Sequence, residues 1–373
     1  MRNSINSSAS AVDFHSQVKP LLAKCCVLLF ASSFFLPSAH AEERKVLNPE
    51  DLPSYVRKIQ NYGERVDFNF DATKVIYVTK PRGEVEELDL KTGKVAKLTA
   101  GLSRKKDLGF FRCNYLRDGR ILVTGGLSRR ECSMFFLSKD RRRLTKLNEP
   151  CWEGPAVSRT SSKIAWTPNH IVIYQADLVF EDGKPLLKNK EEVLTTSDSA
   201  PFIPEYQGRK TAPGKSLKTF VEPQNFVPGQ EELLTYSHYG MDPYTAETMV
   251  INTKTKAITH LTADKGKKHF DAEPEGAFPT GGYTCIESTF LNAKGQNGQE
   301  ILRIKVDGSG APVRLTHFSK IWHRFKATNP VISDDGKWMA FQYGIMWDSV
   351  AGAGYGLFVM DLEKAYAALG IEN

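Results

Sequence analysis

The sequence lacks the short motifs that accompany the commonest hydrolytic and redox sites. It contains no G-x-S-x-G elbow, no H-E-x-x-H zinc pair and no C-x-x-C pair among its six cysteines. These absences argue against an α/β-hydrolase, a zincin peptidase and a zinc ribbon or thioredoxin-type redox centre, in that order. A function must therefore be sought in how the chain is arranged rather than in one local motif.

Long apolar runs are also missing. The most apolar stretch, Cys25–Pro37 (CCVLLFASSFFLP), is shorter than the roughly 20 residues that span a bilayer. It follows Lys19 and Lys24 and precedes Ala39-His40-Ala41, which is the order of charge, apolar run and small residues in a secretory signal peptide. We expect residues 1–41 to be a signal peptide and the mature chain to be periplasmic or secreted, with no transmembrane segment after cleavage.

Neither composition nor charge is extreme. Hydrophobic residues make up 41% and charged residues 25%, which argues against global disorder and against a multi-span membrane protein. Loss of residues 1–41 removes three basic and one acidic residue and lowers the formal net charge from +7 to +5. Basic clusters lie between expected strands, where solvated turns are the default explanation. They are Arg104-Lys105-Lys106, Arg141-Arg142-Arg143 and Lys265-Gly266-Lys267-Lys268. We expect no nucleic-acid partner, and an anionic glycan or lipid surface stays an alternative.

Four cysteines remain after cleavage: Cys113, Cys132, Cys151 and Cys285. An oxidising compartment permits up to two disulfides, with three possible connectivities between which the sequence does not choose. Buried free thiols are the alternative.

What the chain does have is a hairpin pattern that recurs along it. Near the end, Asn329–Gly344 (NPVISDDGKWMAFQYG) places an Asp-Gly turn between two strand-like runs. Similar second strands, each preceded by a turn, occur at six places. They are Lys74–Val78, Arg120–Val123, Lys163–Trp166, Glu232–Thr235, Tyr283–Ile286 and Trp338–Phe341.

Third and fourth apolar strands follow these hairpins, as in Glu87–Leu90 and Val95–Thr99 of the first unit. Four strands per repeat, at a period of about 40 to 50 residues, are typical of a β-propeller. We predict an all-β fold with six four-stranded antiparallel blades over residues 67–365, a lead segment over 42–66 and a C-terminal tail over 366–373.

The last unit, which ends at Leu357–Met360, has no fourth strand of its own. We predict that a segment within Val56–Val66 supplies it and closes the ring, which removes the free sheet edges. An insertion rich in Pro, Gly and charge, Ser197–Lys218, is expected to form a long loop between the third and fourth blades. The only helical candidates are Pro49–Gln60 and Leu362–Leu369.

The hairpin core Ser333–Phe341 (SDDGKWMAF) resembles the blade motif of TolB-type, WD40-like propellers, in which an Asp-Gly-Lys/Arg turn precedes an apolar-Ala-Phe strand. Phe68–Val78 and Glu275–Ile286 carry the resemblance further, and it covers most of residues 67–362. It implies a six-bladed propeller of exported bacterial proteins. The residues outside the repeats are too few for the additional domains of TolB or of prolyl oligopeptidase-like relatives, so we do not expect their peptidase activity here.

In a propeller the innermost strands line the central channel, so residues at their starts gather at one mouth although they are distant in sequence. Carboxylates recur at these positions, which read Arg65, Asp67, Arg112, Glu153, Glu222, Glu273, Glu275 and Asn329. Converging carboxylates would bind a divalent cation such as Ca²⁺, or a cationic group of a partner. The alternative is that the Glu-Pro pairs cap strand entries and face water.

The histidines suggest a second kind of site. Some propeller lyases that act on uronic-acid oligosaccharides hold a metal with several histidines and a glutamine, and the residues to fill these roles here are His269, His317, His323 and Gln342. No spacing links them, and scattered histidines are more often structural.

We expect a monomeric binding module that engages a protein or cell-envelope component through its channel mouth and top loops. The alternative is a metal-dependent lyase or hydrolase acting on acidic oligosaccharide. A mouth lined with carboxylates disfavours an anionic substrate, because like charges repel. No catalytic residue is assigned.

Overall fold

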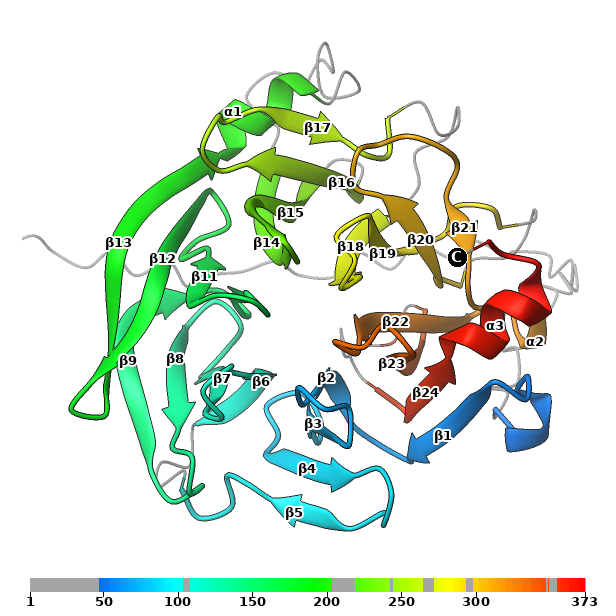
Figure 1. The fold of residues 1–373 in the computed structure, drawn as a ribbon, viewed down its shortest axis with the longest axis horizontal. Helices are drawn as coiled ribbons and strands as arrows, with labels where there is room; N and C mark the ends of the chain where they lie inside the picture. Colours follow the sequence, from blue (N-terminus) through cyan, green and yellow to red (C-terminus); the bar gives the residue numbers. More distant parts are fainter. Residues whose placement is uncertain are drawn as a thin grey trace, which may run out of the picture. The chain divides into compact units, whose positions relative to one another are not determined.

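The computed structural model describes residues 47–102, 108–202, 219–241, 244–263, 272–292, 298–346, 348 and 354–372. In these residues six sheets, each of four antiparallel strands, are arranged in a ring (Figure 1). The predicted six-bladed β-propeller is confirmed. The expected signal peptide over residues 1–41 lies outside the described residues.

The innermost strand of each blade borders the centre of the ring, and the second strand pairs with it. In blade order the innermost strands are β2 (Glu64–Phe68), β6 (Gly109–Tyr115), β10 (Ala156–Val157), β14 (Thr219–Val227), β18 (Ala272–Ala277) and β22 (Phe325–Ile332). The second strands are β3 (Lys74–Val78), β7 (Ile121–Gly126), β11 (Lys163–Trp166), β15 (Gln230–Met241), β19 (Tyr283–Ser288) and β23 (Trp338–Ile345). Each second strand overlaps the segment that the repeat predicts.

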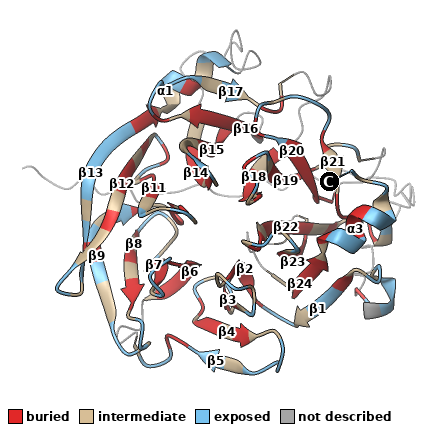
Figure 2. Cartoon of the chain, viewed as in Figure 1, coloured by how far each residue is buried: buried red, intermediate tan, exposed pale blue. Residues whose placement is uncertain are grey.

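Two further strands complete each blade. The third strands are β4 (Val85–Asp89), β8 (Cys132–Leu137), β12 (Val172–Glu181), β16 (Tyr244–Asn252), β20 (Glu300–Lys305) and β24 (Leu357–Asp361). The outer strands are β5 (Val95–Lys97), β9 (Leu144–Cys151), β13 (Lys184–Thr195), β17 (Ile258–His260), β21 (Val313–Arg314) and β1 (Val56–Gln60). Burial falls from the second strands to outer strands such as β13, which is mostly exposed (Figure 2).

The turn between β22 and β23 shows why the hairpin pattern repeats. Asp335 Oδ1 accepts hydrogen bonds from Ser333 Oγ at 2.6 Å and from the backbone N–H of Lys337 at 3.1 Å. Gly336 has φ of +71°, a conformation that a residue without Cβ adopts most readily. Glycines with positive φ occupy the corresponding turns of blades 2, 4 and 5, at Gly119, Gly229 and Gly281.

The ring is closed as predicted, by an N-terminal strand. β1 pairs with β24 antiparallel, with Val56 opposite Met360 and Lys58 opposite Phe358, so it becomes the outer strand of blade 6. The helix expected over Pro49–Gln60 is wrong. Pro49–Asp51 form a single 3₁₀ turn, η1, and Val56–Gln60 are β1, because β24 offers an unpaired edge that satisfies the backbone of this segment.

Six apolar clusters lie between neighbouring blades, one for each pair. Between blades 1 and 2, Ile76 packs with Phe110 and Ile121, and between blades 6 and 1, Ala340 packs with Phe68. Each blade therefore buries its two faces against its neighbours, as the propeller architecture requires.

Short helices occupy some of the connections. α1 (Thr196–Ser199) and the 3₁₀ turn η2 (Ala200–Phe202) begin the expected insertion, whose remaining residues are not described. α2 (Phe318–Ile321) joins blades 5 and 6. The helix predicted over Leu362–Leu369 is confirmed as α3. Among the described residues, none of these helices has the length and apolar character needed to cross a membrane.

Candidate functional site

A break in strand pairing recurs midway along the innermost strands. The register between the first and second strands shifts at Glu64–Asp67, Phe110–Arg112, Pro223–Asn225, Pro274–Ala277 and Thr328–Val331 in blades 1, 2, 4, 5 and 6. Such β-bulges redirect the side chains that they carry. Blade 3 has an irregular residue, Glu153, in place of the bulge. Its φ is +63°, and it lies just before β10.

The bulges determine where the predicted mouth residues lie. Arg65, Asp67, Arg112, Glu222, Glu273, Glu275 and Asn329 lie within the innermost strands, whereas Glu153 lies in the loop before its strand. The prediction from the sequence put all of these residues at the entries of strands. The reason for the difference is that the apolar alternation that marks a strand begins only after the bulge.

Arg65 links carboxylates from two other blades. Its guanidinium forms an ion pair with Glu153 and lies 3.8 Å from Glu275 Oε1. Arg129, from the loop between β7 and β8, reaches the same Glu153 carboxylate at 3.0 Å. The backbone N–H of Arg65 donates to Gln342 Oε1 at 2.8 Å. Blades 1, 2, 3, 5 and 6 thus meet around one arginine.

We define the central charge cluster as seven residues around this arginine that influence one another electrostatically. They are Glu64, Arg65, Arg112, Arg129, Glu153, Glu222 and Glu275. Six of the seven are buried or nearly so, with side-chain exposures of 12% for Arg65 and 5% for Glu222. Water therefore screens these charges weakly.

The arginines of this cluster act most strongly on one carboxylate, that of Glu153. Burial works to raise the pKa of Glu153, but the guanidinium groups of Arg65, Arg129 and Arg112 outweigh it and lower that pKa to about 2. Burial and the negative charge of Glu153 raise the pKa of Glu222 to about 7.

Two further carboxylates have raised pKa values. Burial raises the pKa of Glu64 to about 7. Burial and the neighbouring Glu287 raise the pKa of Glu275 to about 8. At three of the four carboxylates of the central charge cluster, burial thus outweighs the nearby arginines and raises the pKa.

A group of carboxylates adjoins the cluster in blade 5. Ligand oxygens of Glu273, Glu275 and Glu287 lie within 4.8 Å of one another, and we call these three residues the carboxylate corner. Glu273 and Glu287 are direct partners across β18 and β19. Asn329 donates to Glu287 Oε2 from its backbone N–H at 2.8 Å and from Nδ2 at 3.3 Å. Oxygen donors of this kind are those that Ca²⁺ prefers.

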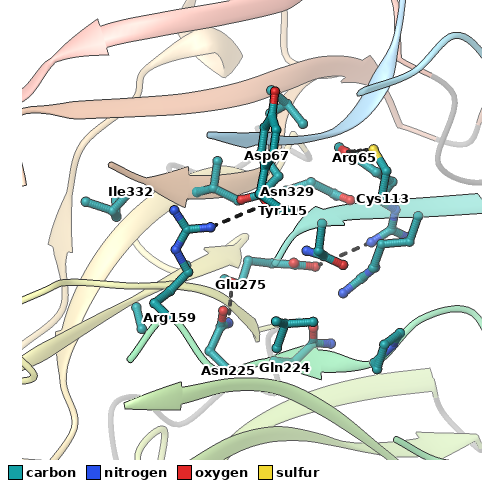
Figure 3. A pocket seen from close by; sticks show the side chains of 18 of the residues that line it. Arg65, Asp67, Cys113, Tyr115, Arg159, Gln224, Asn225, Glu275, Asn329 and Ile332 are labelled. Carbon is teal, nitrogen blue, oxygen red and sulfur yellow. Dashed lines mark hydrogen bonds and ion pairs between the residues drawn. The ribbon is translucent and has the colours of Figure 1, made fainter. Parts of the chain in front are cut away.

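A cavity of about 80 Å³ lies at the centre of the ring, lined by residues of several blades (Figure 3). Glu275, Asn329 and Gln224 border it from blades 5, 6 and 4. Within the described part of the chain, buried atoms of its lining without a hydrogen-bond partner include Nε and Nη2 of Arg112, Oε1 of Gln224 and Oδ1 of Asn329. The cavity thus offers both donors and acceptors to a polar group.

The other end of the channel is occupied by Arg159. It follows β10, and Asp334 lies in the turn between β22 and β23, so both lie where first strands turn into second strands. Arg159 Nη2 is 2.7 Å from Asp334 Oδ2, and Arg159 Nη1 is 3.5 Å from Asp67 Oδ2. Asp67 also accepts from the backbone N–H of Tyr115 at 2.7 Å. Asp67 therefore faces this end rather than the Glu153 end.

The structure describes two of the three histidines of the alternative metal site. His317 and His323 flank α2 in the connection between blades 5 and 6, and Gln342 is buried in β23 beside Arg65. His269 lies outside the described residues. Within the described residues, the carboxylate corner is the group of potential metal ligands that converges, and it contains none of these histidines.

Several residues of the site were not predicted. Glu287 lies on a second strand and Arg129 in a loop between strands, whereas the prediction considered only the starts of first strands. The Gly281-Gly282 turn alone does not place Glu287 opposite Glu273, because the bulge between Pro274 and Ala277 shifts the register by one residue. For Arg129 the sequence holds no signal either.

The comparisons with known proteins concern the fold. No family model matches the sequence, and no curated protein matches it. Similar solved structures include TolB from Acinetobacter baumannii, with 9% identity, a TM-score of 0.47 and coverage of 79% of this chain and 64% of TolB. A puromycin-hydrolysing peptidase from Mycobacterium tuberculosis has 12% identity and a TM-score of 0.47, with 79% and 43% of the two chains covered.

An oligogalacturonate lyase in complex with manganese has 13% identity and a TM-score of 0.45, with 82% of this chain and 79% of the lyase covered. The chain spans less than two thirds of the TolB and peptidase chains. At these identities a likeness concerns the fold alone. The strand order itself establishes that the chain is a six-bladed β-propeller, the architecture implied by its TolB-type hairpin.

Proposed function

We propose that the chain is an exported, periplasmic or secreted, binding module that receives a positively charged group of a protein partner at Glu222 and Glu275. The observation that carries this proposal is the distribution of charge in the central charge cluster. Arg65 and Arg129 are paired with Glu153, and Arg65 also lies 3.8 Å from Glu275. Burial nevertheless outweighs the nearby arginines at Glu222 and Glu275, so these two carboxylates have less compensating charge than Glu153. A lysine or arginine side chain, or a chain terminus, would supply what they lack.

The groups around Glu222 support it as a receiving residue. Tyr239 donates a hydrogen bond to Glu222 Oε2 at 3.2 Å, and His170 Nε2 lies 3.9 Å from the same oxygen. Burial lowers the pKa of His170 to about 4, so this imidazole is neutral near pH 7 and provides no positive charge. Arg112 and Arg65 are the cations that act on Glu222, and Glu153 shares them.

The size of the cavity favours a small guest. Sites for small-molecule ligands usually enclose about 300 to 1,000 Å³. The central cavity, which is lined by Glu275 and not by Glu222, encloses about 80 Å³, which suits the end of a side chain or an ion better than a sugar ring. This favours the binding module over the alternative of an enzyme acting on acidic oligosaccharide.

Exposed apolar side chains support a protein as the partner. We define the mouth face as the face where second strands lead into third strands and outer strands into the next blade. Most of the large, exposed apolar side chains of the described residues lie in these connections: Tyr62, Leu127, Ile171, Phe202 and Leu291. Leu127 is 55% exposed and Leu291 is 53% exposed. Apolar side chains around a polar centre are a common arrangement in protein interfaces.

The test is capture of a partner from an envelope extract by the cross-linked mature chain. We expect the double variant Glu222→Gln and Glu275→Gln to lose at least about tenfold in yield, because two buried charge interactions are removed. The amides resemble the protonated carboxyls, so the variant should fold. Exposed Glu363→Gln is the matched control and should capture as the wild type does. Equal capture by the double variant would overturn the proposal.

A divalent cation at the carboxylate corner is the second candidate, favoured by the convergence of Glu273, Glu275 and Glu287. Calcium should then raise the melting temperature of the wild type and leave that of Glu287→Gln unchanged.

Export is tested separately. If the chain is exported as expected, the purified mature chain should begin at Glu42.

A further inference from the structure

Two cysteines face each other across the edge of blade 2. Cys132 of β8 and Cys151 of β9 are direct partners in the antiparallel pairing of these strands. Directly opposite residues have Cα atoms about 4.5 to 5.5 Å apart and side chains on the same face of the sheet. Disulfides join residues whose Cα atoms are about 4.4 to 6.8 Å apart. We propose that Cys132 and Cys151 form a disulfide when the chain folds under oxidising conditions.

Each of the two thiols contacts a backbone carbonyl oxygen. Cys132 Sγ lies 3.1 Å from the carbonyl oxygen of Ser128, and Cys151 Sγ lies 3.9 Å from that of Trp152. Thiols are weak donors, so rotation of both side chains toward each other gives up little. Apart from burial, the leading influence that raises the pKa of Cys151 is the sulfur of Cys132, which places the two groups within interaction range.

The register also excludes the other pairings. Cys113 lies opposite Val123 in the first two strands of blade 2. Cys285 lies opposite Arg303 in blade 5. Neither faces another cysteine, so these two are expected to stay as thiols. Of the connectivities open to four cysteines, the fold selects one bond.

The position of this bond relates it to the central charge cluster. Cys132 follows the loop that carries Arg129 and Arg130, and Cys151 precedes the loop that carries Trp152 and Glu153. The two loops already meet, because the backbone N–H of Glu153 donates to Arg129 O at 3.1 Å and the Arg130 guanidinium lies 5.3 Å from the centre of the Trp152 ring. A disulfide at their common base holds Glu153 in place beside Arg65.

The chemistry requires an external disulfide as oxidant, either a small one such as oxidised glutathione or that of a thiol oxidase. One cysteine thiolate attacks this disulfide and releases one thiol, and the second cysteine displaces the other thiol from the mixed disulfide. The chain loses two hydrogens, which both leave on the reduced oxidant. Burial raises the pKa of Cys132 to about 12, so few thiolates form in the folded chain. The bond therefore forms while the chain folds, before blade 2 is packed.

The first test is peptide mapping of the full chain, unfolded with reductant and refolded in a buffer of reduced and oxidised glutathione. Free thiols are alkylated under denaturing conditions before digestion with trypsin. We expect a linked pair of the peptides Glu131–Lys139 and Leu147–Arg159, with Cys113 and Cys285 alkylated. Alkylation of all four cysteines, or a link that involves Cys113 or Cys285, would overturn the proposal.

The second test compares melting temperatures with and without reductant, so that any cost of a substitution to folding cancels. Oxidation should raise the melting temperature of the wild type and of Cys285→Ser by about 5 °C, because the bond closes a short loop in the unfolded chain. Cys132→Ser should show no such difference. A difference that persists in Cys132→Ser, or that is absent from the wild type, contradicts the proposal.

Discussion

Arg65 connects its own blade to three others at the central charge cluster. It holds Glu153 from blade 3, approaches Glu275 from blade 5 and donates its backbone N–H to Gln342 from blade 6. Its φ of +55° is a conformation that residues with a Cβ rarely adopt, and the bulge in β2 imposes it. A strained backbone and a buried charge both lower the stability of the fold. Because both are retained at Arg65, we infer that this residue has a role in the site as well as in packing.

Replacement of Arg65 by methionine should destabilise the chain by about 3 to 5 kcal/mol, because it leaves buried carboxylates without their cation. Urea unfolding measures the change. Arg57→Met is the control, because Arg57 is exposed in β1, and it should change stability by less than about 0.5 kcal/mol. Equal effects of the two substitutions would show that Arg65 contributes no more to stability than an exposed arginine does.

Glu222 gives the stability of the chain a pH dependence of known sign. Its pKa is raised from 4.5 to about 7 on folding, so the folded chain binds more protons than the unfolded chain between these values. Its contribution to stability is complete below pH 4.5 and is lost as the pH rises through 7. The total is at most about 3 kcal/mol.

Glu222→Gln should therefore flatten the decline of the melting temperature between pH 5 and pH 8, while Glu64 and Glu275 keep part of it. The stability due to Glu153 has the opposite sign and is lost only below pH 4.5, outside this window. Thermal melts at several pH values measure the effect, with Glu363→Gln as control. A variant that declines as steeply as the wild type would mean that Glu222 is ionised at neutral pH.

Among the elements, β1 has the least typical role. It lies far in sequence from its partner β24, yet it completes blade 6 and buries Val56 in the cluster between blades 5 and 6. Without it, β24 would present a free edge. The stability of the ring should therefore depend on this short strand.

Val56→Asp should lower the free energy of unfolding by about 3 kcal/mol or more, because it buries an unpaired carboxyl at the closing pair. Arg57→Asp, one residue further along and exposed, is the matched control and should have little effect. Denaturant unfolding of both variants tests the comparison. If both lose the same stability, the closing pair is not what β1 contributes.

At this scale the sequence predicted regular elements well and irregular ones poorly. β3 and α3 have the bounds that the sequence predicts, Lys74–Val78 and Leu362–Leu369, because apolar alternation and capping residues mark them locally. Except in blade 3, the innermost strands begin earlier than predicted, because a bulge interrupts the alternation. The predicted helix over Pro49–Gln60 failed, because pairing with β24 outweighs local preference there.

For the whole molecule, the channel is the feature that joins the blades. Arg65 connects blades near one end, and Arg159 reaches from blade 3 to Asp334 of blade 6 at the other. The repeat predicted that residues such as Glu222 and Glu275 would meet, since they occupy equivalent places in their blades. It could not predict Glu64, Glu287 or Arg129, since their positions depend on register and on loop paths.

The most direct measurement of the central claim is the affinity of the captured partner for the immobilised chain at about pH 6 and about pH 8, on either side of the pKa of Glu222. A lysine or arginine of the partner keeps its charge over this range. We predict binding about tenfold tighter at the higher pH, and a clearly smaller difference for Glu222→Gln, in which Glu275, with a pKa of about 8, still ionises in part over this range. Equal affinity at both pH values, or the same difference in the variant, would contradict the claim that Glu222 receives a positively charged group.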